Sequence, residues 1–167
     1  HSNRLYRKNS QNMVYNEKTE ILLSMFLKRP AGSLIISGSR FSGAAEVIQT
    51  ISNTILSEDT SHNIFSVGGN DGPSISIEKI RELKKWLTTR FSNGEGISRI
   101  VIINNAESMT HEAQNALLKV LEEPVSDTVI ILECSEAVNL LETVRSRCKI
   151  IKVLPLTYEQ AMTFAKS

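Results

Sequence analysis

A glycine-containing loop early in the sequence has the spacing of a phosphate-binding loop. Gly38 and Gly43 occupy the two glycine positions of the pattern GxxxxGK[ST], in which backbone amides surround phosphate oxygens. Ala44 replaces the lysine that reaches the outer phosphates, and Ala45 replaces the hydroxyl residue that holds magnesium. The loop therefore lacks the side chains needed for hydrolysis. Its backbone amides and Arg40 still allow weak binding of ATP, ADP or phosphate, while a tight strand-to-helix turn is the simpler interpretation of the loop alone.

Two asparagines follow the apolar run at residues 100–103. An ATPase of this kind needs one carboxylate there to organise magnesium and another to polarise the attacking water. Asn104 and Asn105 carry no charge, so they are poor magnesium ligands and cannot act as a general base. Glu107 follows them, and we expect it to be solvated or favoured by a helix dipole. These positions predict a nucleotidase-like domain without intrinsic ATPase activity.

Cysteines and histidines offer no pattern for metal binding or nucleophilic catalysis. Cys134 and Cys148 are too few for a disulfide framework and lack the close pairing of a zinc ribbon, which indicates reduced thiols. Cys148 stands before an apolar run and is interpreted as a packing thiol. His62 and His111 have no partners at metal-ligand or catalytic-triad spacing. We expect no zinc and no tightly bound cofactor.

Composition and charge restrict the class of protein. The chain has 167 residues, the size of one ordinary domain. Its 19 Lys and Arg against 18 Asp and Glu argue against a protein that coats nucleic acid, so any DNA contact must be local. Apolar runs such as residues 129–132 are strand-sized, and no signal-peptide pattern opens the chain. These features predict a cytoplasmic protein without membrane contact.

The elements that position these residues alternate between helix and strand patterns. Helical spacing predicts helices over residues 17–28, 44–56, 77–91 and 110–122 and a short helical stretch over 138–145. Apolar runs predict strands over residues 33–37, 62–67, 99–103, 128–132 and 149–154. Thr110 is the expected N-cap of the fourth helix. This alternation predicts a doubly wound, mostly parallel α/β sheet of the P-loop NTPase kind, with ligands at the carboxyl ends of its strands.

The chain divides into three parts by this pattern. Residues 1–12 are polar without an apolar period and are interpreted as a flexible N-terminus or a cloning remnant. Residues 13–155 are expected to form one nucleotidase-like domain. Residues 156–167 are expected to begin a lid domain or to form a C-terminal tail.

Two sequence motifs resemble a known family. Residues 115–124 read NALLKVLEEP, and residues 143–148 read TVRSRC. They closely resemble the NALLKxLEEP and TxxSRC signatures of the clamp-loader ATPases of the AAA+ class, in the same order and at similar spacing. Residues 77–83 resemble the family's segment before its central strand, and residues 61–63 more weakly resemble its His-Pro-Asp element. The resemblance covers the chain from about residue 17 onward and implies the AAA+ fold.

Departures from the family pattern indicate which branch the chain resembles. Gamma-type motor subunits keep the loop lysine and the paired acids, whereas delta-prime subunits commonly have degenerate nucleotide sites and retain the SRC element. This sequence follows the second pattern, and residues 52–61 lack the cysteines of the zinc module that both types often carry. The resemblance implies a non-catalytic subunit of a DNA polymerase III holoenzyme that helps load a sliding clamp onto primed DNA. Its implied partners are gamma or tau and delta subunits, the clamp and DNA.

The SRC arginine of this family projects toward the nucleotide of a neighbouring subunit. The resemblance therefore implies that Arg147 is an arginine finger acting in trans, because a guanidinium is always charged and can bridge phosphate oxygens. Ser146, Asn115 and Lys119 are expected near the subunit interface. A surface ion pair is the alternative interpretation of Arg147. An active gamma-type ATPase and a stand-alone interaction domain remain the alternative functions.

Helix 110–122 also carries features that any packed domain would have. Its apolar stripe is expected to pack on the sheet whatever the function is. Glu122 and Glu123 either pair across an interface or lie in water. Trp86 is expected to pack in the core rather than to stack on a nucleic-acid base.

Overall fold

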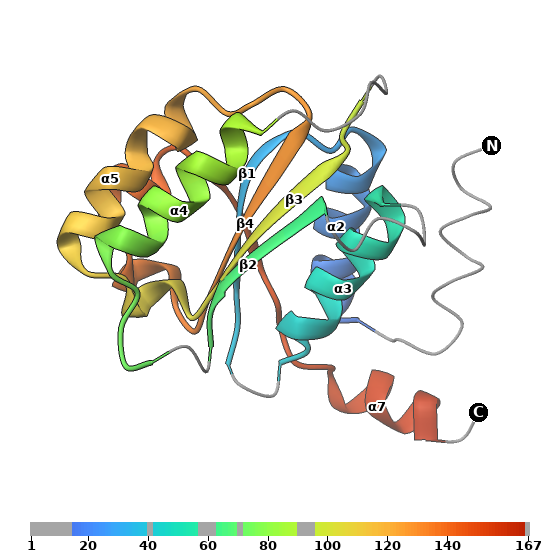
Figure 1. Ribbon diagram of the computed structural model, residues 1–167. Coiled ribbons are helices and arrows are strands. Elements are labelled where there is room, and N and C mark those ends of the chain that lie inside the picture. The colour runs from blue at the N-terminus through green and yellow to red at the C-terminus, as the bar shows by residue number, and fades with distance from the viewer. Residues whose placement is uncertain (1–14, 40–41, 57–62, 70–71, 90–95, 166–167) are drawn as a thin grey trace.

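The computed structural model describes residues 15–39, 42–56, 63–69, 72–89 and 96–165, and in these ranges a parallel sheet lies between two layers of helices (Figure 1). The strands are β1 (Gly32–Ser37), β2 (Ile64–Gly68), β3 (Arg99–Asn104), β4 (Thr128–Cys134) and β5 (Lys149–Lys152). The α-helices are α2 (Glu17–Lys28), α3 (Ala44–Ile55), α4 (Ile77–Thr88), α5 (His111–Glu122), α6 (Glu142–Arg145) and α7 (Tyr158–Ala165). The 3-10 turns with described bounds are η2 (Ala106–Ser108) and η3 (Ala137–Asn139).

The strand order is β2-β3-β4-β1-β5, and every pair of neighbours in the described sheet is parallel. All carboxyl ends therefore lie along one edge, the lower edge in Figure 1. β1 and β4 occupy interior positions, and Leu34, Ile35 and Ile36 are fully buried. Burial on both faces explains why these strands are continuous apolar runs rather than alternating ones. The predicted doubly wound parallel sheet is confirmed.

The two helix layers bury separate parts of the core. α4 and α5 cover one face of the sheet, and α2 and α3 cover the other (Figure 1). Leu83 and Leu117 anchor the first layer, while Leu23 and Ile51 anchor the second, all without exposed surface. Thr110 caps α5 as predicted, because its Oγ1 accepts a hydrogen bond from the amide of Ala113 at 3.1 Å.

Two predicted helices differ from the structure by more than one residue. α4 ends at Thr88 rather than at residue 91, which lies outside the described residues, and Thr89 is extended. The helical stretch predicted over 138–145 is two pieces, η3 and α6. The break falls at Leu141, whose extended backbone places its amide 2.9 Å from Gln114 Oε1 on α5. A partner 27 residues away therefore interrupts the local helical pattern.

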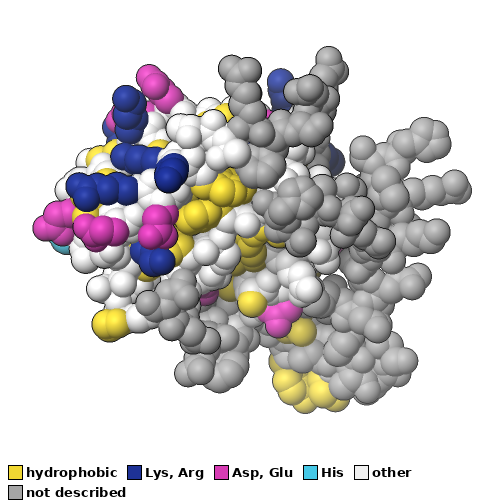
Figure 2. Space-filling model, in the orientation of Figure 1, with side chains coloured by type: hydrophobic (Ala, Val, Ile, Leu, Met, Phe, Trp, Pro, Cys, Tyr) yellow, Lys and Arg dark blue, Asp and Glu magenta, His cyan; other side chains and the backbone are white. Residues whose placement is uncertain are grey.

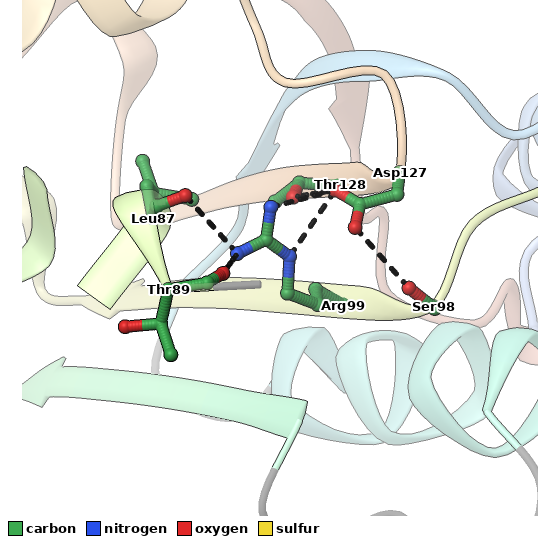
Figure 3. Close-up of polar contacts among 6 residues, drawn as sticks. All are labelled: Leu87, Thr89, Ser98, Arg99, Asp127 and Thr128. Atoms are coloured by element: carbon green, nitrogen blue, oxygen red, sulfur yellow. Dashed lines mark hydrogen bonds and ion pairs between the residues drawn. The ribbon is translucent and has the colours of Figure 1, made fainter. Parts of the chain in front are cut away.

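A buried arginine fixes the end of α4 to the sheet (Figure 3). Arg99, at the start of β3, is 3% exposed and donates from Nε and Nη2 to Asp127 Oδ1 at 3.1 and 2.8 Å. Its Nη1 donates to the carbonyls of Leu87 and Thr89 at 3.2 and 3.1 Å. The guanidinium also lies 5.3 Å from the centre of the Trp86 ring. These contacts pair the last carbonyls of the helix and explain where α4 ends.

The surface over α4 carries charges of both signs. Figure 2 shows Lys and Arg side chains interspersed with Asp and Glu on this face of the molecule. Exposed ion pairs join Lys79 to Glu82 at 3.3 Å and Arg81 to Glu78 at 3.7 Å. Such a mixed surface does not form a basic stripe of the kind that follows a nucleic-acid backbone. None of the described helices has the length and apolar character required to cross a bilayer.

Candidate functional site: a loop with phosphate-loop spacing and an arginine at the opposite edge

The loop between β1 and α3 begins at the carboxyl edge of the sheet, as the sequence predicts for a phosphate-binding loop. The amide of Gly38 donates to the carbonyl of Cys134 at 3.0 Å and ties the loop to β4. Gly43 begins α3 with φ of 91°, a left-handed conformation that favours glycine. Arg40 lies outside the described residues. The strand before a phosphate-binding loop and the helix after it are therefore present at this position.

Ser42 lies directly against the first glycine of the loop. A Cβ atom added to Gly38 would lie 2.2 Å from Ser42 Oγ, so the close approach requires glycine. The amide of Ser42 donates to the carbonyl of Ser39 at 2.8 Å, and its buried Oγ has no hydrogen-bond partner among the described residues. The amides of Gly38 and Ser42 are thus already paired within the chain. Ala44 is buried and Ala45 is exposed, and neither supplies a charge or a hydroxyl group.

Asn104, the last residue of β3, and Asn105, which follows it, form polar contacts at the carboxyl edge of the sheet. Asn104 Nδ2 donates to Ser66 Oγ at 3.0 Å and to the carbonyl of Val67 at 3.4 Å, both on β2. Asn105 has φ of 51°, a left-handed conformation that asparagine tolerates, and its amide donates to Glu133 Oε2 at 2.8 Å. Both residues thus stabilise the turn that leaves the sheet.

Glu107 is held in a hydrogen-bond network, and the prediction that it is merely solvated or favoured by a helix dipole is wrong. Ser135 Oγ donates to its two carboxylate oxygens at 2.7 and 2.8 Å, and Asn139 Nδ2 donates at 2.9 Å. Partial burial by itself would raise the pKa of Glu107, but these hydrogen bonds outweigh it and lower the pKa. Its partners lie 28 and 32 residues further along the chain, so local sequence did not indicate them.

Carboxylates gather beside Cys134 at this edge. Burial, with smaller contributions from Glu107, Glu133 and Glu136, raises the pKa of the Cys134 thiol to about 12. The same negative charges oppose the approach of a phosphate anion to the edge. Among the residues that the structure describes, no group of three or more His, Cys, Asp and Glu is arranged to hold a metal ion.

Both thiols are expected to be nearly unreactive in the folded chain. Burial raises the pKa of the Cys148 thiol to about 12 as well, and thiolate is the reactive form. Alkylation of Cys134 and Cys148 at pH 8 should be more than about a hundredfold slower than that of a free cysteine. Mass spectrometry after timed exposure to iodoacetamide measures this, with the same chain in urea as the control. Rapid modification of either residue in the native chain would contradict the assigned burial.

The SRC residues lie at the opposite edge of the sheet from the loop. Lys149 pairs in register with Leu34, so the segment before β5 lies near the amino end of β1. Arg147, Ser146 and Lys149 line a groove of about 410 Å³ together with Gly32. Gly38 lies six residue steps beyond Gly32 along β1, which corresponds to about 20 Å. Arg147 and the phosphate-binding loop of the same chain therefore do not form one site.

Arg147 forms an ion pair within the chain. Its Nε and Nη2 both donate to Glu122 Oε1, at 2.9 and 2.5 Å. Its Nη1 donates to the carbonyl of Thr143 at 2.7 Å. Within the chain Glu122 therefore pairs with Arg147, and its side chain remains 48% exposed to solvent, while pairing of Glu122 across an interface stays a prediction. The ion pair expected as the alternative for Arg147 is present, and the side chain remains 32% exposed.

Of the remaining residues that the sequence singled out, three are exposed on the surface and two pack against the core. Asn115 and Lys119 are exposed on α5, and Ser146 is exposed beside Arg147. Cys148 is partly buried against the core beneath α4 and α5. Trp86 packs against the same core with Phe65, whose ring centre is 5.6 Å away, as expected of a packing residue.

The sheet order and the loop between its first strand and the following helix define the AAA+ class of P-loop NTPase folds. A crystal structure of a gamma subunit-related protein of DNA polymerase III from Thermotoga maritima superposes with a TM-score of 0.70 at 28% identity. The match covers 86% of this chain and 47% of that one.

The family model described as DNA polymerase III, delta subunit, matches residues 49–157, which is more than half of the chain. The chain belongs to this family of clamp-loader proteins. DNA polymerase III subunit delta' of Bacillus subtilis is 32% identical over 126 residues, covering 74% of this chain and 38% of that protein. A probable replication factor C subunit 2 of Dictyostelium discoideum is 23% identical over 92% of this chain and 45% of that protein. The chain therefore spans less than half the length of these curated relatives.

Proposed function

We propose that this chain is a delta-prime-type clamp-loader subunit that does not hydrolyse ATP and supplies Arg147 to the nucleotide site of a neighbouring subunit. The observation that supports this proposal is that the loop residues and Arg147 lie at opposite edges of the sheet. At the carboxyl edge of the sheet, alanines and asparagines stand where hydrolysis needs a lysine, a hydroxyl and two acids. At the other edge, Arg147 remains partly exposed in an open groove.

An arginine placed in this way can act only on a nucleotide that another subunit holds. The distance of about 20 Å along β1 exceeds the reach of one arginine side chain, so Arg147 does not serve its own loop. Its planar guanidinium can bridge two phosphate oxygens and stabilise the charge that develops during phosphoryl transfer. The partner subunit would supply the phosphate-loop lysine, magnesium and acids.

The proposed partners follow from the family. We propose that gamma or tau and delta subunits assemble with this chain in the cytoplasm, and that the assembly places a sliding clamp on primed DNA. The exposed Asn115, Lys119 and Ser146 are the proposed neighbours of Arg147 at the subunit interface. We propose that the chain itself binds no cofactor tightly.

The loop is expected to bind nucleotide weakly and to turn none over. Ala44 and Ala45 remove the two side chains that engage the outer phosphates and magnesium, and the carboxylates near Cys134 repel an anion. Calorimetric titration with ATP and magnesium is therefore expected to show weak binding at best, and a phosphate-release assay should show no turnover above background. Release that disappears in Gly43→Val would contradict the proposal and indicate a gamma-type ATPase.

Co-purification separates the proposal from a stand-alone interaction domain. The whole protein, purified from its own host, is expected to bring gamma or tau and delta subunits with it. Isolation without any clamp-loader subunit would instead support a function outside the loader.

A further inference from the structure

Arg147 is held on two sides by its own chain. Glu122 Oε1 accepts from both Nε and Nη2, and the carbonyl of Thr143 accepts from Nη1. Glu122 is the last residue of α5, whereas Thr143 belongs to α6, so two elements fix the orientation of one guanidinium. Most exposed arginines have no such restraint, because a long side chain loses conformational entropy when it is held.

The remaining donors of the guanidinium point to a role for this restraint. A guanidinium has five N–H bonds, of which Glu122 accepts two and Thr143 accepts one. One N–H on Nη2 has no acceptor among these contacts, and one on Nη1 has only a long contact of 3.4 Å to Ser146 Oγ. Two donors on adjacent nitrogens thus remain for an incoming group. Phosphate oxygens accept such parallel pairs of N–H bonds.

We infer that Glu122 is a positioning residue for Arg147, one that presents the terminal edge of its guanidinium to the phosphate group of a neighbouring subunit. This inference rests on the proposed function of Arg147 as a finger in trans. Glu122 itself touches no nucleotide in this scheme. Glu122 holds the edge of the guanidinium that carries Nε and Nη2. Less conformational entropy of the side chain is therefore lost when the remaining N–H bonds of Nη1 and Nη2 bind phosphate.

The expected effect is modest because the pair is partly exposed. The side chains of Arg147 and Glu122 are 32% and 48% exposed, so solvent screens their attraction. Pairs of this kind change an equilibrium or a rate by about two- to fivefold. An effect of that size is smaller than that of removing Arg147 itself.

The first measurement tests the pair in the whole protein without partners. The Nε–H of Arg147 is expected to give an NMR signal that is lost in Arg147→Lys and that exchanges slowly with water. Glu122→Ala should speed this exchange, because the acceptor for Nε and Nη2 is removed. Glu123→Ala removes the adjacent exposed carboxylate and serves as the matched control with unchanged exchange. Equal exchange in Glu122→Ala and the wild type would overturn the inference.

The second measurement tests positioning in a reconstituted loader with clamp and primed DNA. Glu122→Ala is expected to lower kcat for ATP by about two- to fivefold without raising KM, since orientation matters chiefly in the transition state. Glu122→Gln should restore part of the loss, because its amide oxygen still accepts from the fork. Glu123→Ala should leave kcat unchanged. A purely structural role for Glu122 would lower the unfolding temperature and assembly without this graded change in kcat.

The outcomes separate this inference from the proposed function on which it rests. If Arg147→Ala leaves turnover unchanged, the finger assignment fails. If Arg147→Ala lowers turnover but Glu122→Ala does not, only the positioning inference fails. A higher kcat in Glu122→Ala would also overturn it, because Glu122 would then restrain Arg147 rather than present it.

Discussion

In a reconstituted loader, Arg147→Ala is expected to lower DNA-stimulated ATP turnover and clamp loading while the subunit remains folded and assembled. A trans-acting arginine contributes about 10³- to 10⁵-fold to the rate in well-studied phosphoryl-transfer proteins. The single site that Arg147 is proposed to serve should lose an effect of that order. Total turnover should fall by less, because the other interfaces keep their own catalytic groups. Steady-state phosphate release with clamp and primed DNA present measures the loss.

Two further substitutions make this test specific. Arg147→Lys should restore little activity, because an ammonium group cannot reproduce the planar fork that engages two phosphate oxygens. Arg145→Ala removes a nearby basic residue that lies at the end of α6 and is expected to have a smaller effect. If neither Arg147→Ala nor Arg145→Ala lowered ATP turnover, the SRC motif would indicate the fold and not an arginine finger.

The fold could be predicted because its elements are locally encoded. β1 and β4 are apolar runs of strand length, and helices such as α2 and α5 carry clear apolar periods between recognisable caps. Parallel strands that alternate with helices permit few topologies. The bounds of α2 and the N-cap of α5 were therefore predicted to the residue.

The polar contacts of the two edges could not be predicted, because they join residues that are far apart in sequence. Glu107 accepts a hydrogen bond from Ser135, 28 residues further along the chain, and Arg147 donates to Glu122, 25 residues earlier. From the local sequence, Glu107 was expected to be solvated or favoured by a helix dipole, and Glu122 was expected to lie in water or to pair across an interface. At the loop after β1, the sequence shows directly which groups stand there, such as Ala44 at the position of the lysine. The absence of ATP hydrolysis therefore stays a prediction from residue types, whereas the new contacts could not be predicted from the sequence.

The predicted end of α4 was too late for a related reason. Helical spacing continues to residue 91, but Arg99 pairs with the carbonyls of Leu87 and Thr89 and with Asp127. A basic residue at the start of a strand carries no local signal that it will be buried. Tertiary contacts with this arginine thus override the local preference for helix.

Arg99→Met is expected to cause the largest loss of stability of any substitution considered. The apolar side chain fills similar space but leaves the carboxylate of Asp127 and the carbonyls of Leu87 and Thr89 without their partner. Removing one partner of a fully buried ion pair typically costs about 3–5 kcal/mol of unfolding free energy. Because the Asp127 side chain is 29% exposed, the expected loss is at the lower end of that range, about 3 kcal/mol. Urea denaturation followed by circular dichroism measures this. Arg81→Ala, which removes an exposed pair, should cost less than about 0.5 kcal/mol.

The pH dependence of stability should identify Asp127 as the carboxylate in this network. Partial burial opposes ionisation of Asp127, but the hydrogen bond and charge of Arg99, together with Thr128 and Ser98, lower its pKa below the usual value. A group with a lowered pKa in the folded state stabilises that state above its unfolded pKa, near 4, and this contribution is lost as the pH falls further. Asp127→Asn should therefore be less stable than the wild type at neutral pH, and the difference should shrink below about pH 4. A difference that stayed constant between pH 7 and pH 2 would show that the ionised carboxylate contributes nothing to the stability of the fold.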